Sequence, residues 1–247
     1  MSTKKDFSEK MNCAYCPVVR KICRRPDGKG PPACPTIQQE EILKLANQHY
    51  HDDAGILEFA RQASIQEGEA YANRKPGPYI MQPHKTRMEE LIEFAGKMGY
   101  RKLGIAFCGG VTHEASILST ILEMHGFEVV AVSCKVGSVP KEDIGLQENQ
   151  KVRIGEYETM CNPIGQAELL NNADTDFNIM LGLCVGHDSL FLKYIKGFAT
   201  ILAVKDRVTG HNPMAALYTA HSYYQKLKKL EMGSDAEMKS RMTAGKK

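Results

Sequence analysis

The residues with the most evident capacity for chemistry are eight cysteines, which fall into two sets of four. The first set, residues 13–34, reads Cys-x2-Cys-x6-Cys-x10-Cys and consists of Cys13, Cys16, Cys23 and Cys34. A CxxC pair with two further cysteines close by brings four thiolates within reach of one metal ion or cluster. We expect a metal site here, with a [4Fe–4S] cluster slightly preferred and structural zinc as the alternative. The basic residues among these cysteines would lower the pKa values of the thiols, or they form only a solvated basic face around unliganded thiols.

The second set lies where apolar segments end. Cys108, Cys134 and Cys184 each follow a predicted strand, and Cys161 precedes a predicted helix. Parallel strands bind ligands outside their carboxyl ends, at the point where the strand order reverses. We therefore expect these thiols to converge at one edge of a sheet and to hold a cluster through three or four ligands. Cysteines that only fill the core would instead lie within the strands.

Polar residues follow the same strands. Glycines in these turns allow backbone N–H groups to approach a cluster or an anion closely; they are Gly109, Gly110 and Gly186. Two histidines at helix starts and two cations after the fourth strand are candidates for orienting or protonating a substrate. These four catalytic candidates are His113, His187, Lys205 and Arg207. The alternatives are ordinary helix-start residues for the histidines and salt-bridged scaffolding for the cations.

The elements that would position these residues alternate along the chain. Helical spacing of apolar residues predicts helices within 37–73, and Thr86 with Glu89 predicts a capping box at the start of the next helix. Beyond residue 99, short apolar strands alternate with helices, which indicates a parallel sheet covered on both faces. The predicted strands are 102–107, 127–133, 177–183 and 199–205, and the predicted helices are 112–125, from 163, 188–196 and 213–230, with Asn212 as the cap of the last.

The predicted fold is therefore α/β, an open and mostly parallel Rossmann-like sheet in the order 2-1-3-4. Four segments are expected: a cysteine-rich metal-binding segment (1–36), a helical segment (37–98), the α/β domain with the strand-end cysteines (99–231) and a flexible tail (232–247). The strand-one turn is not GxGxxG, and Cys134-Lys135 stands where a dinucleotide fold carries an acid. A nicotinamide dehydrogenase is therefore not expected.

Charge and hydropathy indicate the environment. The formal net charge is +3 over 247 residues, which gives no argument for nucleic acid or an anionic membrane surface. No secretory signal or membrane span is evident, so we expect a cytoplasmic protein. Stable disulfides are disfavoured in that compartment, which favours metal binding by the cysteines.

The assembled motifs resemble the cysteine-rich, metal-binding proteins of anaerobic bacteria and archaea grouped as domain of unknown function 1847. The resemblance covers about residues 11–230 and rests on the first cysteine set and on three segments: 161–168 (CNPIGQAE), 182–188 (GLCVGHD) and 204–213 (VKDRVTGHNP). It implies metal binding but no particular reaction. By architecture alone, cysteines at strand ends are similar to those of 2-hydroxyacyl-CoA dehydratases and thiouracil desulfidases, an analogy of fold that does not fix function.

Two functional hypotheses follow. The first is an iron–sulfur enzyme, an oxidoreductase or lyase of the reductive or desulfidase type, which acts on a small anionic substrate or serves a redox partner protein. The second is a non-enzymatic zinc or iron–sulfur scaffold, a metal or cluster carrier, or a redox sensor. A weaker third is a sulfur carrier with one nucleophilic strand-end cysteine. Homo-oligomerisation is left open by the sequence.

Overall fold

The computed structural model describes residues 12–18, 23, 30–75 and 80–229. The chain divides into two compact units, residues 1–84 and 85–247. The flexible tail expected over 232–247 and much of the segment 1–36 lie outside the described residues. In the described part, no helix is long and apolar enough to cross a membrane.

The first unit is mainly helical. The predicted helical region 37–73 resolves into α1 (Pro35–Gln38), α2 (Glu40–Asp52) and α3 (Ala54–Glu69), followed by a short antiparallel pair of β1 (Tyr71–Ala72) and β2 (Gln82–Pro83). Asp53 separates α2 from α3 because its carboxylate accepts hydrogen bonds from the Gly55 and Ile56 N–H groups. A carboxylate in this role caps the first turn of the new helix and ends the preceding one.

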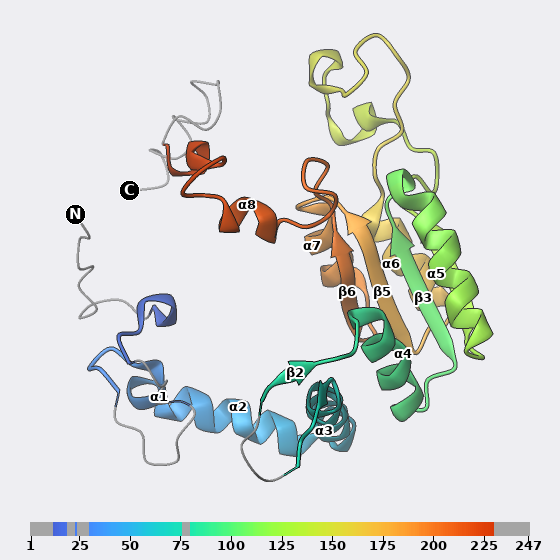
Figure 1. Cartoon of the computed structure of the whole chain (residues 1–247). Helices are drawn as coiled ribbons and strands as arrows, with labels where there is room; N and C mark the ends of the chain where they lie inside the picture. Colours follow the sequence, from blue (N-terminus) through green and yellow to red (C-terminus); the bar gives the residue numbers. More distant parts are fainter. Residues whose placement is uncertain (1–11, 19–22, 24–29, 76–79, 230–247) are drawn as a thin grey trace. The chain divides into compact units, whose positions relative to one another are not determined.

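The second unit is a parallel sheet with helices on both faces (Figure 1). Its strands run in the order β4-β3-β5-β6, which confirms the predicted order 2-1-3-4. The elements are α4 (Arg87–Lys97), β3 (Lys102–Phe107), α5 (Thr112–Met124), β4 (Glu128–Ser133), α6 (Pro163–Asn172), β5 (Phe177–Leu183), α7 (His187–Tyr194), β6 (Ala199–Val204) and α8 (Met214–Tyr218), with 3-10 turns at Gly109–Val111, Lys141–Ile144, Glu148–Gln150 and Gln225–Lys228.

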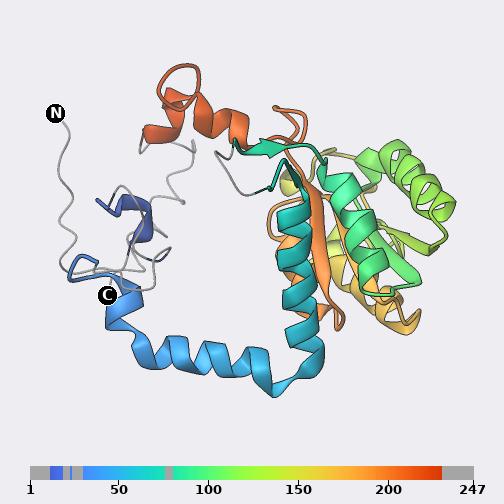
Figure 2. The ribbon, with the colours of Figure 1, turned by 60° about the horizontal axis from the view of Figure 1, so that its bottom comes forward.

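The two central strands are the most deeply buried. Every residue of β5 is buried, and β3 is buried over its inner four residues. Figure 1 shows α5 on one face of the sheet and α6 and α7 on the other, and Figure 2 shows the same layers from a second direction. Burial on both faces explains why these strands are continuous apolar runs rather than alternating ones.

Helix α4 belongs to the second unit, although the sequence grouped it with the helical segment 37–98. Its Thr86–Glu89 capping box is present as predicted. The guanidinium of Arg87 donates hydrogen bonds to the Ile201 carbonyl at 2.9 Å and to the Thr200 hydroxyl at 2.8 Å. Phe94 packs against Phe177 with ring centroids 5.8 Å apart. These long-range contacts with β5 and β6 were not readable from local periodicity.

The last predicted helix is much shorter than expected. It is α8, which ends at Tyr218, and Pro213 rather than Asn212 is its N-cap residue. The Thr219 hydroxyl donates to the Ala215 carbonyl, and the Thr219 carbonyl accepts hydrogen bonds from the Ser222 and Tyr224 N–H groups. These bonds replace the helical ladder by turns, as is typical where Ser and Thr offer alternative partners to the backbone.

The connection between β4 and α6, which leaves the sheet at Cys134 and returns at Cys161, is a folded polar loop that we call the polar excursion. Lys151, whose side chain is buried, forms ion pairs with Glu142 and, at 2.8 Å, with Glu148. Lys141 and Glu158 form a second, partly buried ion pair at 2.6 Å. Pro140 and Thr159 form a β-bridge near the base. The long connection noted in the sequence is therefore held by its own charges, and it leaves the sheet at Cys134 and returns at Cys161.

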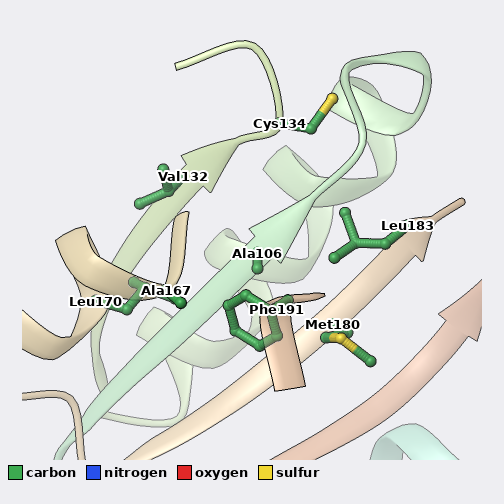
Figure 3. Packing of buried hydrophobic residues seen from close by; sticks show 8 residues of the cluster. All are labelled: Ala106, Val132, Cys134, Ala167, Leu170, Met180, Leu183 and Phe191. Carbon is green, nitrogen blue, oxygen red and sulfur yellow. The ribbon is translucent and has the colours of Figure 1, made fainter. Parts of the chain in front are cut away.

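A core cluster lies between the sheet and the helices α6 and α7 (Figure 3). Its members come from three strands and two helices: Ala106, Val132, Cys134, Ala167, Leu170, Met180, Leu183 and Phe191. Figure 3 shows Cys134 beyond the end of β4, at the boundary of this cluster. Apolar packing thus reaches the edge where the strand-end cysteines lie.

Replacing Gly104 by Ala should destabilise the sheet. The added Cβ would collide with the Asn178 side-chain oxygen and would lie 3.1 Å from the Leu170 methyl groups. We expect a loss of about 1–3 kcal/mol of unfolding free energy, the usual range for overpacking, measured by urea denaturation. Gly96→Ala is the matched control, because nothing lies within 4 Å of its new Cβ on the exposed side of α4. That substitution should stabilise by about 0.5–1 kcal/mol through helix propensity; equal effects at both glycines would contradict the packing described.

Candidate thiol site at the strand ends

Strand pairing positions Cys108 and Cys134 side by side. Phe107 and Ser133 are partners in the β3–β4 register, and each cysteine is the next residue of its chain. The Cys134 N–H donates to the Phe107 carbonyl at 2.8 Å, so the ladder continues past the strand ends. Paired residues of neighbouring strands present their side chains on the same face. Both thiols therefore emerge together at the carboxyl edge.

The start of α6 brings Cys161 to the same place. The Asn162 N–H donates to the Cys134 carbonyl at 2.7 Å, and the Asn162 side chain accepts a hydrogen bond from the Gly165 N–H as the N-cap of α6. Pro163 occupies the first turn, where a missing N–H costs nothing. The cap and the backbone bond together fix where Cys161 enters the site.

Gln166 on α6 joins the ends of β3 and β4 through its side-chain amide. Its side chain is fully buried, and its Nε2 donates to the Phe107 carbonyl at 3.1 Å and to the Val132 carbonyl at 2.7 Å. Its Oε1 is buried without a partner among the described residues. One amide on α6 thus bridges β3 and β4 immediately before Cys108 and Cys134.

Three thiols form one network with Cys134 at its centre. Cys108 and Cys161 both pack against the core cluster that contains Cys134, so the Cys134 thiol lies beside both of them. The hydrogen bond with Cys134 is the largest cause that lowers the pKa of Cys108, to about 4, and that of Cys161, to about 5. The same bonds, together with burial, raise the pKa of Cys134. Cys134 therefore keeps its proton as the shared donor, and its two neighbours carry the negative charge.

Backbone and side-chain donors stabilise these thiolates. The Gly109 N–H lies 3.3 Å from Cys134 Sγ, and the Gly110 N–H is hydrogen bonded to Cys108. Lys205 also contacts Cys108, and its Nζ lies 3.5 Å and 3.6 Å from the positions that a Cβ would take at Gly110 and Gly182. The lysine ammonium therefore lies next to both glycines and to the Cys108 thiol. The charges of Lys135 and His187 act on Cys161 in the same direction.

Cys184 is held by a separate cation. Arg207 donates a hydrogen bond from its guanidinium to Cys184 Sγ at 3.3 Å. The pKa of Arg207 is raised first by this bond, and the charges of Cys108 and Cys161 raise it further. Arg207 therefore lies within electrostatic reach of three of the four thiols. Cys184 follows β5, and Arg207 follows β6, as the predicted topology requires.

The turn after β6 is shaped by Asp206 and His211. Asp206 accepts hydrogen bonds from the Val208 and Thr209 N–H groups, and His211 Nδ1 lies 2.9 Å from the Val204 carbonyl. These bonds shape the turn that carries Lys205 and Arg207. Asp206 and His211 therefore act as scaffold in this structure.

The two candidate histidines differ in their surroundings. His187 is half-buried at the start of α7, after Gly186 with its positive φ of 85°. His113 is exposed on the first turn of α5. The charge of His187 acts on Cys161, whereas in the described part of the chain His113 is not among the groups that act on a strand-end thiol, so the surroundings favour His187 over His113.

The first cysteine set is only partly brought together. Cys13, Cys16 and Cys34 line one small cavity of about 20 Å³ with Asn12 and Pro35, which is room for one water-sized body. Asn12 caps the short 3-10 turn Cys13–Tyr15 through its side chain. Cys23 is exposed and is not among the residues that line this cavity. Several of the basic residues counted with this set lie outside the described residues.

Neither cysteine set forms a ready-made coordination site. Within the described ranges, no three His, Cys, Asp or Glu side chains are arranged as the ligands of a metal ion. None of the eight cysteines, all of which are described, is in a disulfide. At the strand ends the arrangement is a hydrogen-bonded thiol network beside cations, with Cys184 turned to Arg207.

Sequence reasoning missed three residues that organise the site: Asn162, Gln166 and Lys135. The Asn-Pro pair before an apolar helix is a recognisable N-cap signal and could have identified Asn162. Lys135 donates to the Thr159 carbonyl across the base of the excursion. Gln166 carries no such local signal, because its partners lie 34 and 59 residues away.

The thiolates should react at low pH. Since the pKa values of Cys108 and Cys161 lie below neutrality, their alkylation by iodoacetamide should change less than about twofold between about pH 6 and 8, whereas an ordinary thiol gains about a hundredfold. Site-resolved mass spectrometry measures these rates. Cys134→Ala removes the donor and should restore the ordinary pH dependence, and Cys134→Ser, which keeps a hydroxyl donor, should restore it less. A rate that rises in proportion to hydroxide in the wild type would refute the network.

Gln166→Met should destabilise the strand ends while keeping the side-chain volume. Two buried carbonyls would each lose a donor, although the Phe107 carbonyl keeps its bond from Cys134. We expect a cost of about 1–3 kcal/mol, read from urea denaturation, together with slower alkylation of Cys108 at about pH 6. An unchanged midpoint with unchanged alkylation would show that the amide does not position the thiols.

Comparisons with known proteins agree with the resemblance expected from the motifs. An uncharacterised protein, MJ0455, from the archaeon Methanocaldococcus jannaschii is 48% identical over 178 residues, which cover 72% of this chain and 86% of that protein. No solved structure matches the chain. A family model described as a protein of unknown function, DUF1847, matches residues 34–202, a range that contains all four strand-end cysteines and, of the first set, Cys34. The chain belongs to the DUF1847 family.

Proposed function

We propose that the strand-end cysteines bind an iron–sulfur cluster and that this centre acts on a small anionic substrate. The observation that carries the proposal is the placement of Cys108, Cys134 and Cys161, which come from separate segments of the chain and lie in or against one core cluster at the carboxyl edge of a parallel sheet. Thiolates are the ligands that iron–sulfur clusters and other soft metal centres require. Two of the three already have thiolate character.

The donor set fits such a group chemically. Metal ligation needs deprotonated thiols, and Lys205 and the Gly110 N–H offset the charge at Cys108. Cys184 would be the fourth ligand after release from Arg207, and a three-cysteine site would leave Arg207 paired with it. A bound cluster would supply electron-transfer or Lewis-acid chemistry at this edge.

The surroundings support a reacting site more than a purely structural one. Arg207 is exposed, and Val185 and Val208 in the adjoining turns are 93% and 77% exposed, so solutes reach the rim. A guanidinium at that rim suits a carboxylate or phosphate. Lys205 lies beside Cys108, and the charge of His187 acts on Cys161, so both would orient or protonate such a substrate. A reductive or lyase-type reaction is the class that a cluster beside proton donors would serve.

The first cysteine set would hold a separate metal. Cys13, Cys16 and Cys34 share a cavity suited to a single ion. This observation favours zinc there over the cluster that the sequence slightly preferred. Its role would be structural, stabilising the segment around α1.

Metal analysis of anaerobically prepared protein tests both sites. Iron, acid-labile sulfide and zinc would be measured per chain in wild type, Cys134→Ala, Cys16→Ala and a matched control, Val185→Ala, which alters an exposed residue next to Cys184. We expect about four irons and four sulfides with brown colour in the wild type, loss of both in Cys134→Ala, and loss of zinc alone in Cys16→Ala.

The outcomes separate the alternatives. Protein that remains colourless after anaerobic reconstitution with iron and sulfide, and that holds zinc only, rejects the cluster and favours a zinc scaffold. Parallel loss of both metals in either variant would contradict two independent sites. Val185→Ala should keep full metal content; if it does not, loss in the cysteine variants reflects misfolding.

A further inference from the structure

The exposure of the three thiols suggests a second chemistry besides metal binding. Cys134 is 3% exposed, whereas Cys108 and Cys161 on either side of it are only half-buried. In this arrangement an accessible thiolate can attack an external disulfide and form a mixed disulfide. The buried thiol can then attack that mixed disulfide and form a disulfide within the protein.

Backbone geometry makes the pair Cys134–Cys161 able to form a disulfide. The 2.7 Å bond from the Asn162 N–H to the Cys134 carbonyl joins the peptide groups that directly follow Cys161 and Cys134. A hydrogen bond between these two peptide groups holds the two Cα atoms close to the separation of about 4.4–6.8 Å that disulfides need. The Cys161 side chain also packs against the core cluster that contains Cys134.

Cys161 is better placed than Cys108 as the attacking residue. Cys108 follows β3 directly, and its thiol is engaged by Lys205 and by the Gly110 N–H. Cys161 lies between the polar excursion and α6, outside any strand, so its backbone can adjust to disulfide dihedral angles.

We propose that this protein also carries out thiol–disulfide exchange with low-molecular-weight disulfides, with Cys161 as the attacking residue and Cys134 as the resolving residue. The Cys161 thiolate attacks one sulfur of R–S–S–R, which forms Cys161–S–S–R and releases RS⁻. The Cys134 thiol then attacks Cys161 Sγ, which forms the Cys134–Cys161 disulfide, and its proton leaves with the second RSH. Two protein thiols are oxidised to one disulfide, and the small disulfide is reduced to two thiols.

The new bond would close the polar excursion at its base. The excursion leaves the sheet at Cys134 and returns at Cys161, where Pro140–Thr159 bridging and the Lys135 bond to the Thr159 carbonyl already join its two ends. The disulfide would also remove two thiolates from any metal site. Exchange and metal binding would therefore exclude each other.

The test uses the full chain, reduced and freed of metal by a chelator, with bis(2-hydroxyethyl) disulfide as the probe. After quenching with N-ethylmaleimide, peptide mapping by mass spectrometry should find the Cys134–Cys161 disulfide in the wild type. Cys134→Ser should instead accumulate the mixed disulfide on Cys161, and Cys161→Ser should form neither product. Val185→Ala, the matched control at an exposed residue of the same edge, should behave as the wild type does.

Three results would overturn the proposal: a disulfide between Cys108 and Cys134 instead, a mixed disulfide on Cys161 that persists in the wild type, or no modification of Cys161. If Cys134→Ser does not fold, time-resolved quenching of the wild type decides, since the mixed disulfide must rise and then fall. The proposal shares residues with the cluster site but does not depend on it. Metal-binding protein without exchange refutes this inference alone, and exchange in protein that never holds metal refutes the cluster alone.

Discussion

The interaction on which the site depends is the continuation of the β3–β4 ladder beyond the last strand residues. The bond from the Cys134 N–H to the Phe107 carbonyl keeps the two chains paired where each presents a cysteine, and Gln166 ties the same strand ends from α6. Repulsion between the thiolates of Cys108 and Cys161 opposes their approach, and the backbone bonds at the strand ends act against it. Strand pairing holds the thiols close together, and the proton on Cys134 reduces the electrostatic repulsion between them.

A second consequence of this pairing is that one residue, Cys134, belongs both to the hydrophobic core and to the strand-end thiol site. Cys134 belongs to the apolar cluster with Ala106 and Phe191, yet its thiol faces Cys108 and Cys161. Core packing therefore extends to a thiol that lies at the strand-end edge. The neighbouring Cys108 and Cys161 thiols, together with burial, raise the pKa of Cys134, and its proton stabilises the charge of its neighbours.

Much of this arrangement could be predicted because it follows from topology. Strand order, parallel pairing and the positions of Cys108, Cys134 and Cys184 at strand exits all depend on apolar runs and connection lengths, which are local features of the sequence. The membership of α4 and the bridging by Gln166 depend on contacts such as Arg87 with Ile201, more than a hundred residues apart. No local pattern encodes these contacts. The last helix was predicted too long. Apolar spacing was extended over residues 213–230, although Thr219 and Ser222 favour turns there.

The charge balance around the thiols also bears on why Cys184 stands apart. Lys205, seated where Gly110 and Gly182 have no side chains, serves Cys108, while Arg207 serves Cys184. Each cation follows β6, so one turn, shaped by Asp206 and His211, sets the electrostatics of both ends of the site. A guanidinium bond to a thiol is stronger when the thiol is ionised, so release of Cys184 to another partner requires that partner to carry comparable positive charge. A metal centre meets that requirement, whereas a neutral ligand does not.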